Sequence, residues 1–404
     1  MEHYKKYRLK DFIKFKTGKL NSNAAVSNGK YPFFTCSQEI FRTNTYSFDT
    51  EAVLLGGNNA NGIFPLKYFI GKFDTYQRTY VIESLDKKKL NNRYLYYALG
   101  LVLEHLRTIS TGATTKFITK GIIENIEIPI VEIDKQQKIA TILSNYDNLI
   151  ENNTKRIELL EKTVKLIYDE WFVRFKFPGH EKVKFVDSEL GKIPEGWEVK
   201  GITDVEYFNF ISENIKQFEG EKEYFATANI DGIDIIKEGI MYSYKDKPSR
   251  AQKQPTIYSV WFARMKDTYK VLGFTKINED IANNSMLSSG FAGFSSEKLV
   301  FPFLYYTINS KYFHKEKDRF ATGATQVSLN NENLSKIKVI VPNNNIIKLF
   351  GEKVISILNK IFLLQIKNQN LKKTRDFLLP KLVSGEVDVS DLNIKVPKMQ
   401  EVVV

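Results

Sequence analysis

Two stretches of the chain, residues 134–175 and 343–385, carry apolar residues at alternating intervals of three and four positions. This repeat places them along one face of a helix and is typical of a coiled coil. In the first stretch the repeat positions are Leu143, Tyr146, Ile150, Asn153, Ile157, Leu160, Val164, Ile167 and Trp171. In the second they are Val354, Ile357, Ile361, Leu364, Asn368, Leu371, Arg375, Leu378 and Leu382. Each stretch therefore predicts one long helix.

Local signals mark the ends of both predicted helices. Asp134 and Gln137 form the capping-box pattern of a helix start, and the Pro and Gly of "FKFPGH" end the first run. We expect the second helix to bend or end near Pro380, before "LVSGEV". Two matched apolar faces in one chain favour an antiparallel coiled coil between the helices. The alternative is that each helix packs only on its own domain.

The rest of the chain is rich in short β-branched and aromatic runs separated by Gly and Asn. "YPFFTC", "AVLLGGNNANGIF" and "TYVIES" are typical of strands and turns. Residues 91–107 instead have the length and spacing of a helix. The second half repeats this plan, so we predict an α+β protein with a mixed α/β domain before each long helix.

A long phrase occurs twice in the chain. "TGATTKFITKGIIENIEIPI" begins at Thr111, and "TGATQVSLNNENLSKIKVIV" begins 211 residues later at Thr322. Upstream, "YLYYAL" and "FLYYTI" match at an offset of 209. This period is far longer than the roughly 20–50 residues of a solenoid repeat and indicates duplication of a whole domain with its helix. The predicted segments are a first domain (1–133), a first helix (134–175), a linker with a second domain (176–342), a second helix (343–385) and a tail (386–404).

Composition narrows the class of protein. At 404 residues the chain exceeds the usual size of one hydrophobic core. Its single cysteine, Cys36, is typical of the reducing cytoplasm. We expect neither a secretory signal nor a membrane span, because no apolar run is long enough. The net charge of +12 moderately favours a polyanionic partner such as nucleic acid.

Motifs for catalysis and cofactor binding are missing from the sequence. It holds no G-x-x-x-x-G-K-[ST] loop, G-x-S-x-G elbow or H-E-x-x-H pair. We find no glycine fingerprint for a dinucleotide or S-adenosylmethionine, and "GGNNANG" fits a surface loop better than a cofactor cradle. Four histidines and one cysteine do not suffice for a zinc cluster. The sequence therefore predicts a binding protein without a cofactor or metal of its own.

Several segments occur in an order that points to one protein family. The first TGAT phrase is followed by "KQQKIATILSNYDNLIENN" and by "LIYDEWFVRFKFPGHEKVKFVDSELGKIPEGWEV", and the second by "RDFLLPKLVSGEV". In this order they resemble the specificity (S) subunit of Type I restriction–modification systems. The resemblance covers essentially the whole chain. Residues 20–105 and 205–300 share little sequence with the family. This is expected of the regions that determine which DNA bases are recognised.

The resemblance implies two target-recognition domains related by a pseudo-twofold axis and separated by two long antiparallel helices that form a coiled coil. Each domain would read one half of a bipartite sequence in double-stranded DNA. The helices would dock two methyltransferase (M) subunits, and restriction (R) subunits would join through the complex. S-adenosylmethionine, ATP and magnesium would bind only those partners. The alternatives are an S-like protein with its own nuclease activity and a helical scaffold that does not bind DNA.

Candidate DNA contacts are polar side chains in the loops that follow predicted strands, because such groups reach base edges and phosphates. In the first domain they are Asn58, Asn59, Asn61, Gln77 and Arg78; in the second they are Arg264, Lys266, Lys270, Asn283, Asn284 and Ser288. From the repeated phrase we add Thr111, Thr114 and Lys116 with Thr322, Thr325 and Gln326 as a shared scaffold or phosphate site. The alternative for this phrase is that its glycine only makes a turn before the last strand.

Overall fold

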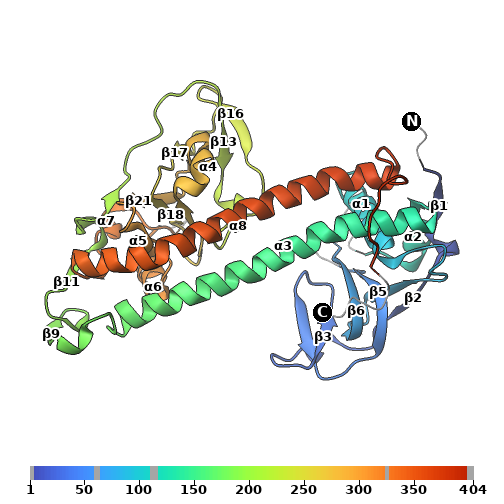
Figure 1. Cartoon of the computed structure of the whole chain (residues 1–404), viewed down its shortest axis with the longest axis horizontal. Helices are drawn as coiled ribbons and strands as arrows, with labels where there is room; N and C mark the ends of the chain where they lie inside the picture. Colours follow the sequence, from blue (N-terminus) through green and yellow to red (C-terminus); the bar gives the residue numbers. More distant parts are fainter. Residues whose placement is uncertain (1–3, 59–63, 110–116, 324–326, 398–404) are drawn as a thin grey trace. The chain divides into compact units, whose positions relative to one another are not determined.

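The computed structural model describes residues 4–58, 64–109, 117–323 and 327–397, and the chain forms two compact units (Figure 1). Unit 1 combines Met1–Ile150 with Asn370–Val404, and unit 2 is Glu151–Gln369. Helices and sheets occur in both units, so the expected α+β class is confirmed. Each long helix contributes one part to each unit. The segments predicted from the sequence instead had their boundaries at the ends of the helices.

Unit 1 is built on a six-stranded sheet in the order β2-β7-β5-β6-β3-β4. The strands are β2 (Ile13–Thr17), β3 (Tyr31–Phe34), β4 (Ile40–Thr43), β5 (Phe48–Gly56), β6 (Leu66–Thr75) and β7 (Thr79–Ser84). Central strand β5 is apolar on both faces. Val53 and Leu55 pack with the helix α1 (Asn92–Ile109), whereas Leu54 packs with aromatic side chains on the other face. A central strand buried on both sides explains the continuous run "AVLL".

Smaller elements close unit 1. Strand β1 (Lys6–Arg8) pairs antiparallel with β8 (Glu127–Pro129). The 3₁₀ turn η1 (Leu9–Asp11) and helix α2 (Lys120–Asn125) lie beside them, and η2 (Ser22–Ala24) follows β2. The residues after the last helix also return to this unit, where Val389 is fully buried and Lys138 donates to the carbonyls of Val389 and Ser390 at 3.3 and 2.6 Å. The tail is therefore part of the unit 1 core.

Unit 2 contains two four-stranded sheets, in the orders β12-β21-β18-β19 and β16-β13-β20-β17. The strands of the first are β12 (Asn209–Phe210), β18 (Ser259–Ala263), β19 (Val271–Phe274) and β21 (Phe291–Ser295); those of the second are β13 (Glu221–Phe225), β16 (Ile240–Ser243), β17 (Ala251–Lys253) and β20 (Ser285–Ser288). Trp261 and Leu287 belong to one buried cluster, so the two sheets share a core. On the other face, Val260 and Phe262 pack against helices.

Short helices and hairpins complete unit 2. The helices are α4 (Glu279–Asn284), α5 (Phe301–Ile308), α6 (Lys311–Phe320) and α7 (Asn331–Leu334). The paired strands are β9 (Phe185–Ser188) with β10 (Gly191–Pro194), β11 (Glu198–Gly201) with β22 (Lys338–Val341), and β14 (Ile230–Asp231) with β15 (Asp234–Ile235). The 3₁₀ turns are η4 (His180–Lys182), η5 (Ile202–Asp204), η6 (Thr227–Asn229) and η7 (Lys276–Asn278).

The duplication extends to individual backbone hydrogen bonds. Strands β2-β7-β5-β6 of unit 1 correspond in order to β12-β21-β18-β19 of unit 2. Leu9 N donates to Ile126 O at 2.9 Å, and Ile202 N donates to Ile337 O at the same distance. Because Ile126 and Ile337 are also 211 residues apart, the repeat found in the sequence is a repeat of structure.

Helix α3 (Ile133–Tyr168) and helix α8 (Asn344–Ser384) correspond to the two predicted long helices. A π-helical turn, η3 (Asp169–Val173), follows α3. Helix α3 begins at Ile133, so Asp134 lies inside the first turn and the expected capping box is wrong. Of the two outcomes expected near Pro380, a bend or an end of the helix, the end is also wrong. The helix continues to Ser384 because Leu382 and Val383 are buried in unit 1 and hold its last turn in place.

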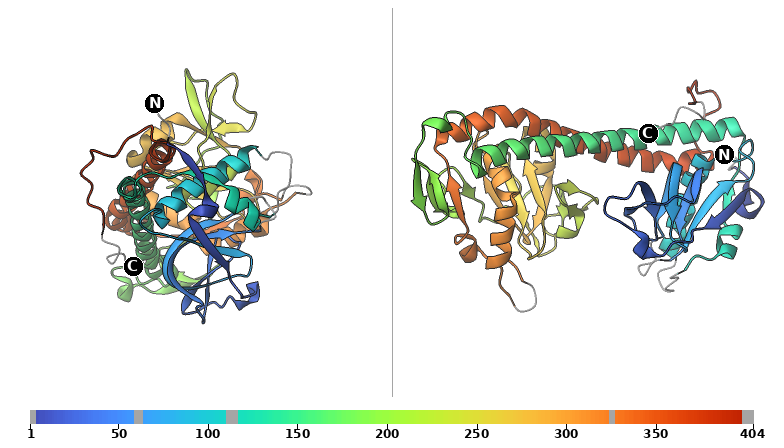
Figure 2. Two further views of the ribbon diagram at one scale, coloured as in Figure 1. Left: turned by 90° about the vertical axis from the view of Figure 1, so that its right-hand side faces the viewer. Right: turned by 90° about the horizontal axis from the view of Figure 1, so that it is seen from below.

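The predicted pairing of the two helices is present within each unit, where they lie side by side (Figure 2). None of the repeat positions is exposed. Leu143 of α3 shares a buried cluster with Leu382 of α8 in unit 1, and Val164 shares one with Val354 in unit 2. The start of α3 thus meets the end of α8, and the reverse, so the helices are antiparallel. The same clusters contain strand residues, so each helix also packs on a domain.

The two polar positions in the repeat of α8 have polar partners on α3. In unit 2, Asn153 Nδ2 donates to Asn368 Oδ1 at 2.9 Å, and Asn368 Nδ2 donates to Thr154 Oγ1 at 3.3 Å. In unit 1, Arg375 Nη1 donates to Asp147 Oδ1 at 2.7 Å. A shift of either helix by one turn would bury these groups without partners, so they specify the register.

The asparagine pair gives a testable prediction about the coiled coil. Asn368→Leu alone leaves the Asn153 amide without its partner and should lower the free energy of unfolding by about 1–2 kcal/mol. The double variant Asn153→Leu/Asn368→Leu should recover most of that loss, because neither polar group remains. Urea unfolding of the wild type, both single variants and the double variant measures the coupling. A double variant as unstable as the sum of the singles would show that the pair does not interact.

Candidate nucleic-acid interface

Three segments of unit 1 meet at the end of strand β5: residues 57–58, the β6–β7 turn and the residues before α2. Gly57 N donates to Arg78 O at 2.8 Å, and Ile118 N donates to Gly57 O at 2.9 Å. Asn58 forms a β-bridge with Phe117. A Cβ atom at Gly57 would lie 2.8 Å from the Tyr80 ring, so the close approach requires glycine. We call this meeting point the unit 1 junction.

Three of the candidate residues lie at the unit 1 junction. Gln77 and Arg78 are exposed, and Asn58 is half-buried. The structure therefore brings together loops that are some 20 residues apart in the sequence. Asn59, Asn61, Thr111, Thr114 and Lys116 lie outside the described residues.

Sequence reasoning missed two exposed residues beside this junction. Phe117 is exposed next to Asn58. Lys19 is exposed in a segment that reaches the junction because Gln77 N donates to Leu20 O at 3.0 Å. No local pattern marks either residue, since the contacts that place them join distant parts of the chain.

Unit 2 has an equivalent junction after strand β18. Leu329 N donates to Arg264 O at 2.9 Å and Arg264 N donates to Gly290 O at 2.8 Å, which repeats the bonds made by Gly57 in unit 1. Lys266 N donates to Val327 O at 3.0 Å. We call residues 264–270 the β18–β19 loop and this meeting point the unit 2 junction. Ile118 and Leu329, each seven residues after the start of its TGAT phrase, thus support the equivalent loop in both units.

Thr322 begins the second TGAT phrase and forms a β-bridge with Ser328. Its backbone exchanges two hydrogen bonds of 3.0 Å with Ser328. This geometry gives the start of the phrase a role in the scaffold, while contact with a phosphate stays a prediction. Thr325 and Gln326 lie outside the described residues.

Two candidates of unit 2 are built into the fold. The Arg264 guanidinium donates to Phe291 O, Leu329 O and Asn331 Oδ1 at 3.3, 3.0 and 2.7 Å, and burial lowers the pKa of Arg264. Ser288 is only 4% exposed, and its hydroxyl accepts from Gly290 N at 3.2 Å. Such engaged or buried groups are poorly placed to contact a base, so these positions favour a role in holding the junction.

The remaining candidates of unit 2 are closer to the surface. Lys266 is exposed in the β18–β19 loop. Lys270 is half-buried, and its ammonium donates to Thr227 O at 2.8 Å. Asn283 and Asn284 are exposed at the end of α4, before β20, whereas the unit 2 junction lies after the other end of that strand. The structure therefore places Lys266, but not the two asparagines, at the junction. Exposed Arg250, which sequence reasoning missed, lies nearby because its carbonyl accepts from Ser289 N at 2.7 Å.

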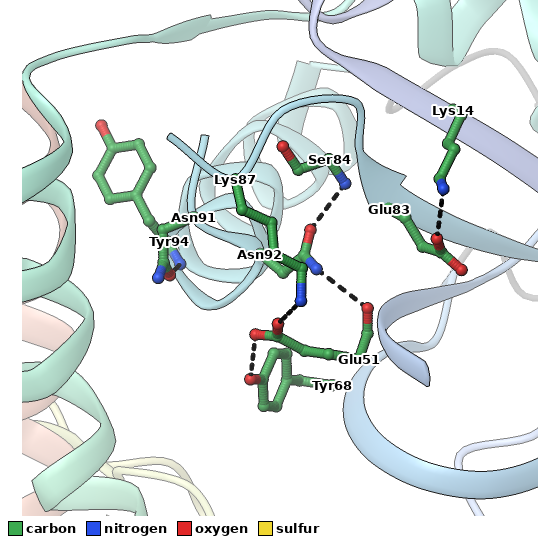
Figure 3. Close-up of polar contacts among 9 residues, drawn as sticks. All are labelled: Lys14, Glu51, Tyr68, Glu83, Ser84, Lys87, Asn91, Asn92 and Tyr94. Atoms are coloured by element: carbon green, nitrogen blue, oxygen red, sulfur yellow. Dashed lines mark hydrogen bonds and ion pairs between the residues drawn. The ribbon is translucent and has the colours of Figure 1, made fainter. Parts of the chain in front are cut away.

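A group of polar residues around the start of α1 has a structural role (Figure 3). The Glu51 carboxylate accepts from Tyr68 OH at 2.7 Å and from Lys87 Nζ at 2.8 Å. Asn92 donates to Glu51 O at 2.9 Å and accepts from Ser84 N at 2.8 Å. Burial, together with the hydrogen bond to Glu51, raises the pKa of Tyr68. These contacts tie β5, β6 and β7 to α1.

Comparison with known proteins identifies the class of protein to which these two units belong. Residues 1–162 match the family described as "Type I restriction modification DNA specificity domain". The MjaIX specificity subunit of Methanocaldococcus jannaschii is 30% identical over 328 residues, which cover 76% of this chain and 72% of the relative. The MjaVIII specificity subunit of the same organism is 28% identical over 97% of this chain and 95% of the relative. The chain therefore belongs to the family of Type I restriction enzyme specificity subunits.

Two further comparisons agree with this assignment. The EcoDI specificity subunit of Escherichia coli is 37% identical over 58% of this chain and 59% of the relative. The crystal structure of a Type I restriction–modification S subunit from M. genitalium has a TM-score of 0.61 and 18% identity, and covers 94% of this chain and 96% of that chain. This likeness shows that the fold is shared. Among the helices of the described residues, none is both long and apolar enough to cross a membrane.

The unit 2 junction gives a prediction that separates DNA contact from support of the fold. Lys266→Ala should leave the thermal stability unchanged, because the side chain is exposed. It should weaken DNA binding and reduce the salt slope of log K by about one if the ammonium contacts a phosphate. Arg264→Gln should instead lower the free energy of unfolding by roughly 1–3 kcal/mol, because buried acceptors lose their donor.

Thermal unfolding and fluorescence anisotropy on labelled duplex DNA over a salt series measure both effects. The binding assay uses the full chain together with the other subunits of its Type I system. If Lys266→Ala changed neither the affinity nor the salt slope, Lys266 would not be a DNA contact.

Proposed function

We propose that this specificity subunit is non-catalytic and reads a bipartite DNA sequence, one half-site with each unit. The observation that carries the proposal is the repeated junction. The same backbone bonds hold the loop after β5 and the loop after β18, but the residues held differ: Gly57 and Asn58 in one, Arg264 and Met265 in the other. A constant scaffold with variable loops suits two readers of different sequences.

Catalysis belongs to the partners in this proposal. Methyl transfer would take place on the modification subunits, which would hold S-adenosylmethionine. Translocation and cleavage would take place on restriction subunits that use ATP and magnesium. The Glu51 carboxylate of unit 1 and the Arg264 guanidinium at the unit 2 junction are held by partners within the fold, as expected of structural groups.

Two modification subunits would dock on matching surfaces of the long helices. Leu166 of α3 is 54% exposed, and Phe377 of α8, 211 residues later, is 64% exposed. One turn earlier, Thr163 and Thr374 are both exposed. An exposed large apolar side chain at the same place in both copies favours a partner that binds twice. In this proposal, one docking surface would lie in each unit.

Exchange of one domain tests the assignment of half-sites. Replacing residues 176–342 with the matching segment of another specificity subunit should change one half of the methylated sequence and leave the other half unchanged. Single-molecule sequencing of methylated host DNA measures this directly. A change in both halves would contradict one reader per half-site. Metal-dependent cleavage of DNA by the isolated chain would instead favour the nuclease alternative.

Charge substitution tests the docking surfaces. Leu166→Asp and Phe377→Asp should each reduce the assembly from two modification subunits to one, and the double variant should bind none, because a carboxylate opposes apolar burial. Native mass spectrometry counts the subunits. Leu149→Asp is the matched control, since Leu149 is 52% exposed but its counterpart in the other copy is the polar residue Lys360. Assembly of both subunits on the double variant would exclude these surfaces.

A further inference from the structure

The β18–β19 loop of unit 2 contains an unfavourable backbone conformation that needs support. Asp267 has a φ of 54°, in the left-handed region that non-glycine residues rarely adopt. Such a conformation persists only where neighbouring groups hold it. Backbone bonds from Lys266 to Val327 and from Leu329 to Arg264 support one side of this loop.

Two adjacent residues of helix α6, Lys317 and Asp318, hold the other side of the loop. Lys317 is 0% exposed, and its ammonium donates to Met265 O at 2.6 Å and to Asp318 Oδ1 at 2.7 Å. Asp318 Oδ1 also accepts from Asp267 N at 3.1 Å, and Oδ2 accepts from Tyr269 OH at 3.0 Å. The pair therefore contacts three of the five residues from Met265 to Tyr269.

The pKa values of Asp318 and of the neighbouring His314 agree with the hydrogen bonds of the Lys317–Asp318 pair. Burial alone raises the pKa of the Asp318 carboxyl, but its bonds from Lys317, Tyr269 and the Asp267 backbone outweigh burial and hold the pKa below its ordinary value. The His314 ring lies edge-on to the Tyr269 ring with centroids 4.9 Å apart. Burial, with a smaller effect of Lys317, lowers the pKa of His314 to about 4, so the ring is neutral at pH 7. A buried ammonium costs much less when a carboxylate and a carbonyl compensate it.

The outer surface of the held loop faces open space. Lys266 and Asp267 are exposed, and Tyr269 is 55% exposed. The loop forms one wall of a groove of about 560 Å³, and the stretch from Thr227 to Gly232 contributes to the other. A rigid loop beside an open groove presents its polar groups without further loss of conformational entropy on binding.

The first copy of the domain cannot form the same pair. Lys317 and Asp318 correspond to Thr108 and Ile109 at the offset of 209, and to Leu106 and Arg107 at the offset of 211, so neither alignment gives a lysine beside an aspartate. The helices differ as well. In unit 2, Asn309 and Ser310 separate α5 from α6, with the Ser310 hydroxyl accepting from Phe313 N at 3.1 Å, whereas α1 of unit 1 is continuous. The pair is therefore specific to the second copy.

We infer that Lys317 and Asp318 are positioning residues that fix the β18–β19 loop as the rigid reading element for the second half-site. This inference rests on the proposed function of unit 2. The two residues do not touch DNA themselves. They act by holding the backbone of Met265 and Asp267, and with it the direction of the Lys266 side chain. Loss of the pair should relax base discrimination in one half-site only.

The experiment uses the full chain assembled with its modification subunits and measures methylation of duplex libraries randomised in one half-site at a time. Asp318→Asn should reduce the preference for the correct base pairs of the second half-site by roughly tenfold, the effect of losing one well-placed base contact. Discrimination in the first half-site should stay at the wild-type value. Arg319→Gln is the matched control, because it breaks the neighbouring Arg319–Glu316 ion pair of α6. Within the described part of the chain this pair forms no hydrogen bond or ion pair with the loop, so the control should change neither preference.

Asp318→Asn leaves the Lys317 ammonium buried without its carboxylate, so this variant could lose discrimination because it unfolds. A second variant separates loss of the loop contacts from unfolding. Lys317→Met/Asp318→Leu removes both charges, keeps apolar volume and should give the same selective loss at a melting temperature close to that of the wild type. Unchanged discrimination in this folded variant, or an equal loss in both half-sites, would overturn the inference. If the wild-type complex itself showed no preference in either half-site, the proposed function would fail instead.

Discussion

The burial of the repeat faces of α3 and α8 against each other is the interaction on which both units depend. Each helix begins in one unit and ends in the other. The core of unit 1 therefore contains the start of α3 and the end of α8, and the core of unit 2 contains the end of α3 and the start of α8. In unit 1, Leu382 and Val383 pack with strands that precede them by some 300 residues. Unit 1 is therefore built from two separate stretches of chain, and a cut before α8 would remove part of its core.

The apolar faces supply most of the attraction, but they do not select one alignment of the helices by themselves. A leucine or isoleucine face tolerates a slip of one turn, whereas a buried amide or guanidinium does not. Asn368 and Arg375 meet Asn153 and Asp147 in the observed alignment. These two polar contacts, one in each unit, explain why the repeat is interrupted where it is.

Duplication kept the scaffold and left the loops free to differ. Gly57 and Arg264 form equivalent backbone hydrogen bonds in the two units. These bonds constrain the path of the backbone but not the identity of the side chain. Unit 2 adds the buried Lys317 and its partner Asp318, which the first copy does not have in its sequence. A family of DNA readers can change its target in this way, because the groups that vary are not those that close the core.

The sequence by itself determined the long helices, the duplication, the α+β class and the family, because periodicity and repeated phrases are written in local residue order. Only the tertiary structure decided which unit each helix segment joins, that α8 passes Pro380, and that α3 starts before Asp134. It also decided that Arg264 and Ser288 face inward while Lys266 faces outward. The physical reason is that a polar side chain in a loop follows its hydrogen-bond partners, and those partners lie far away in the sequence.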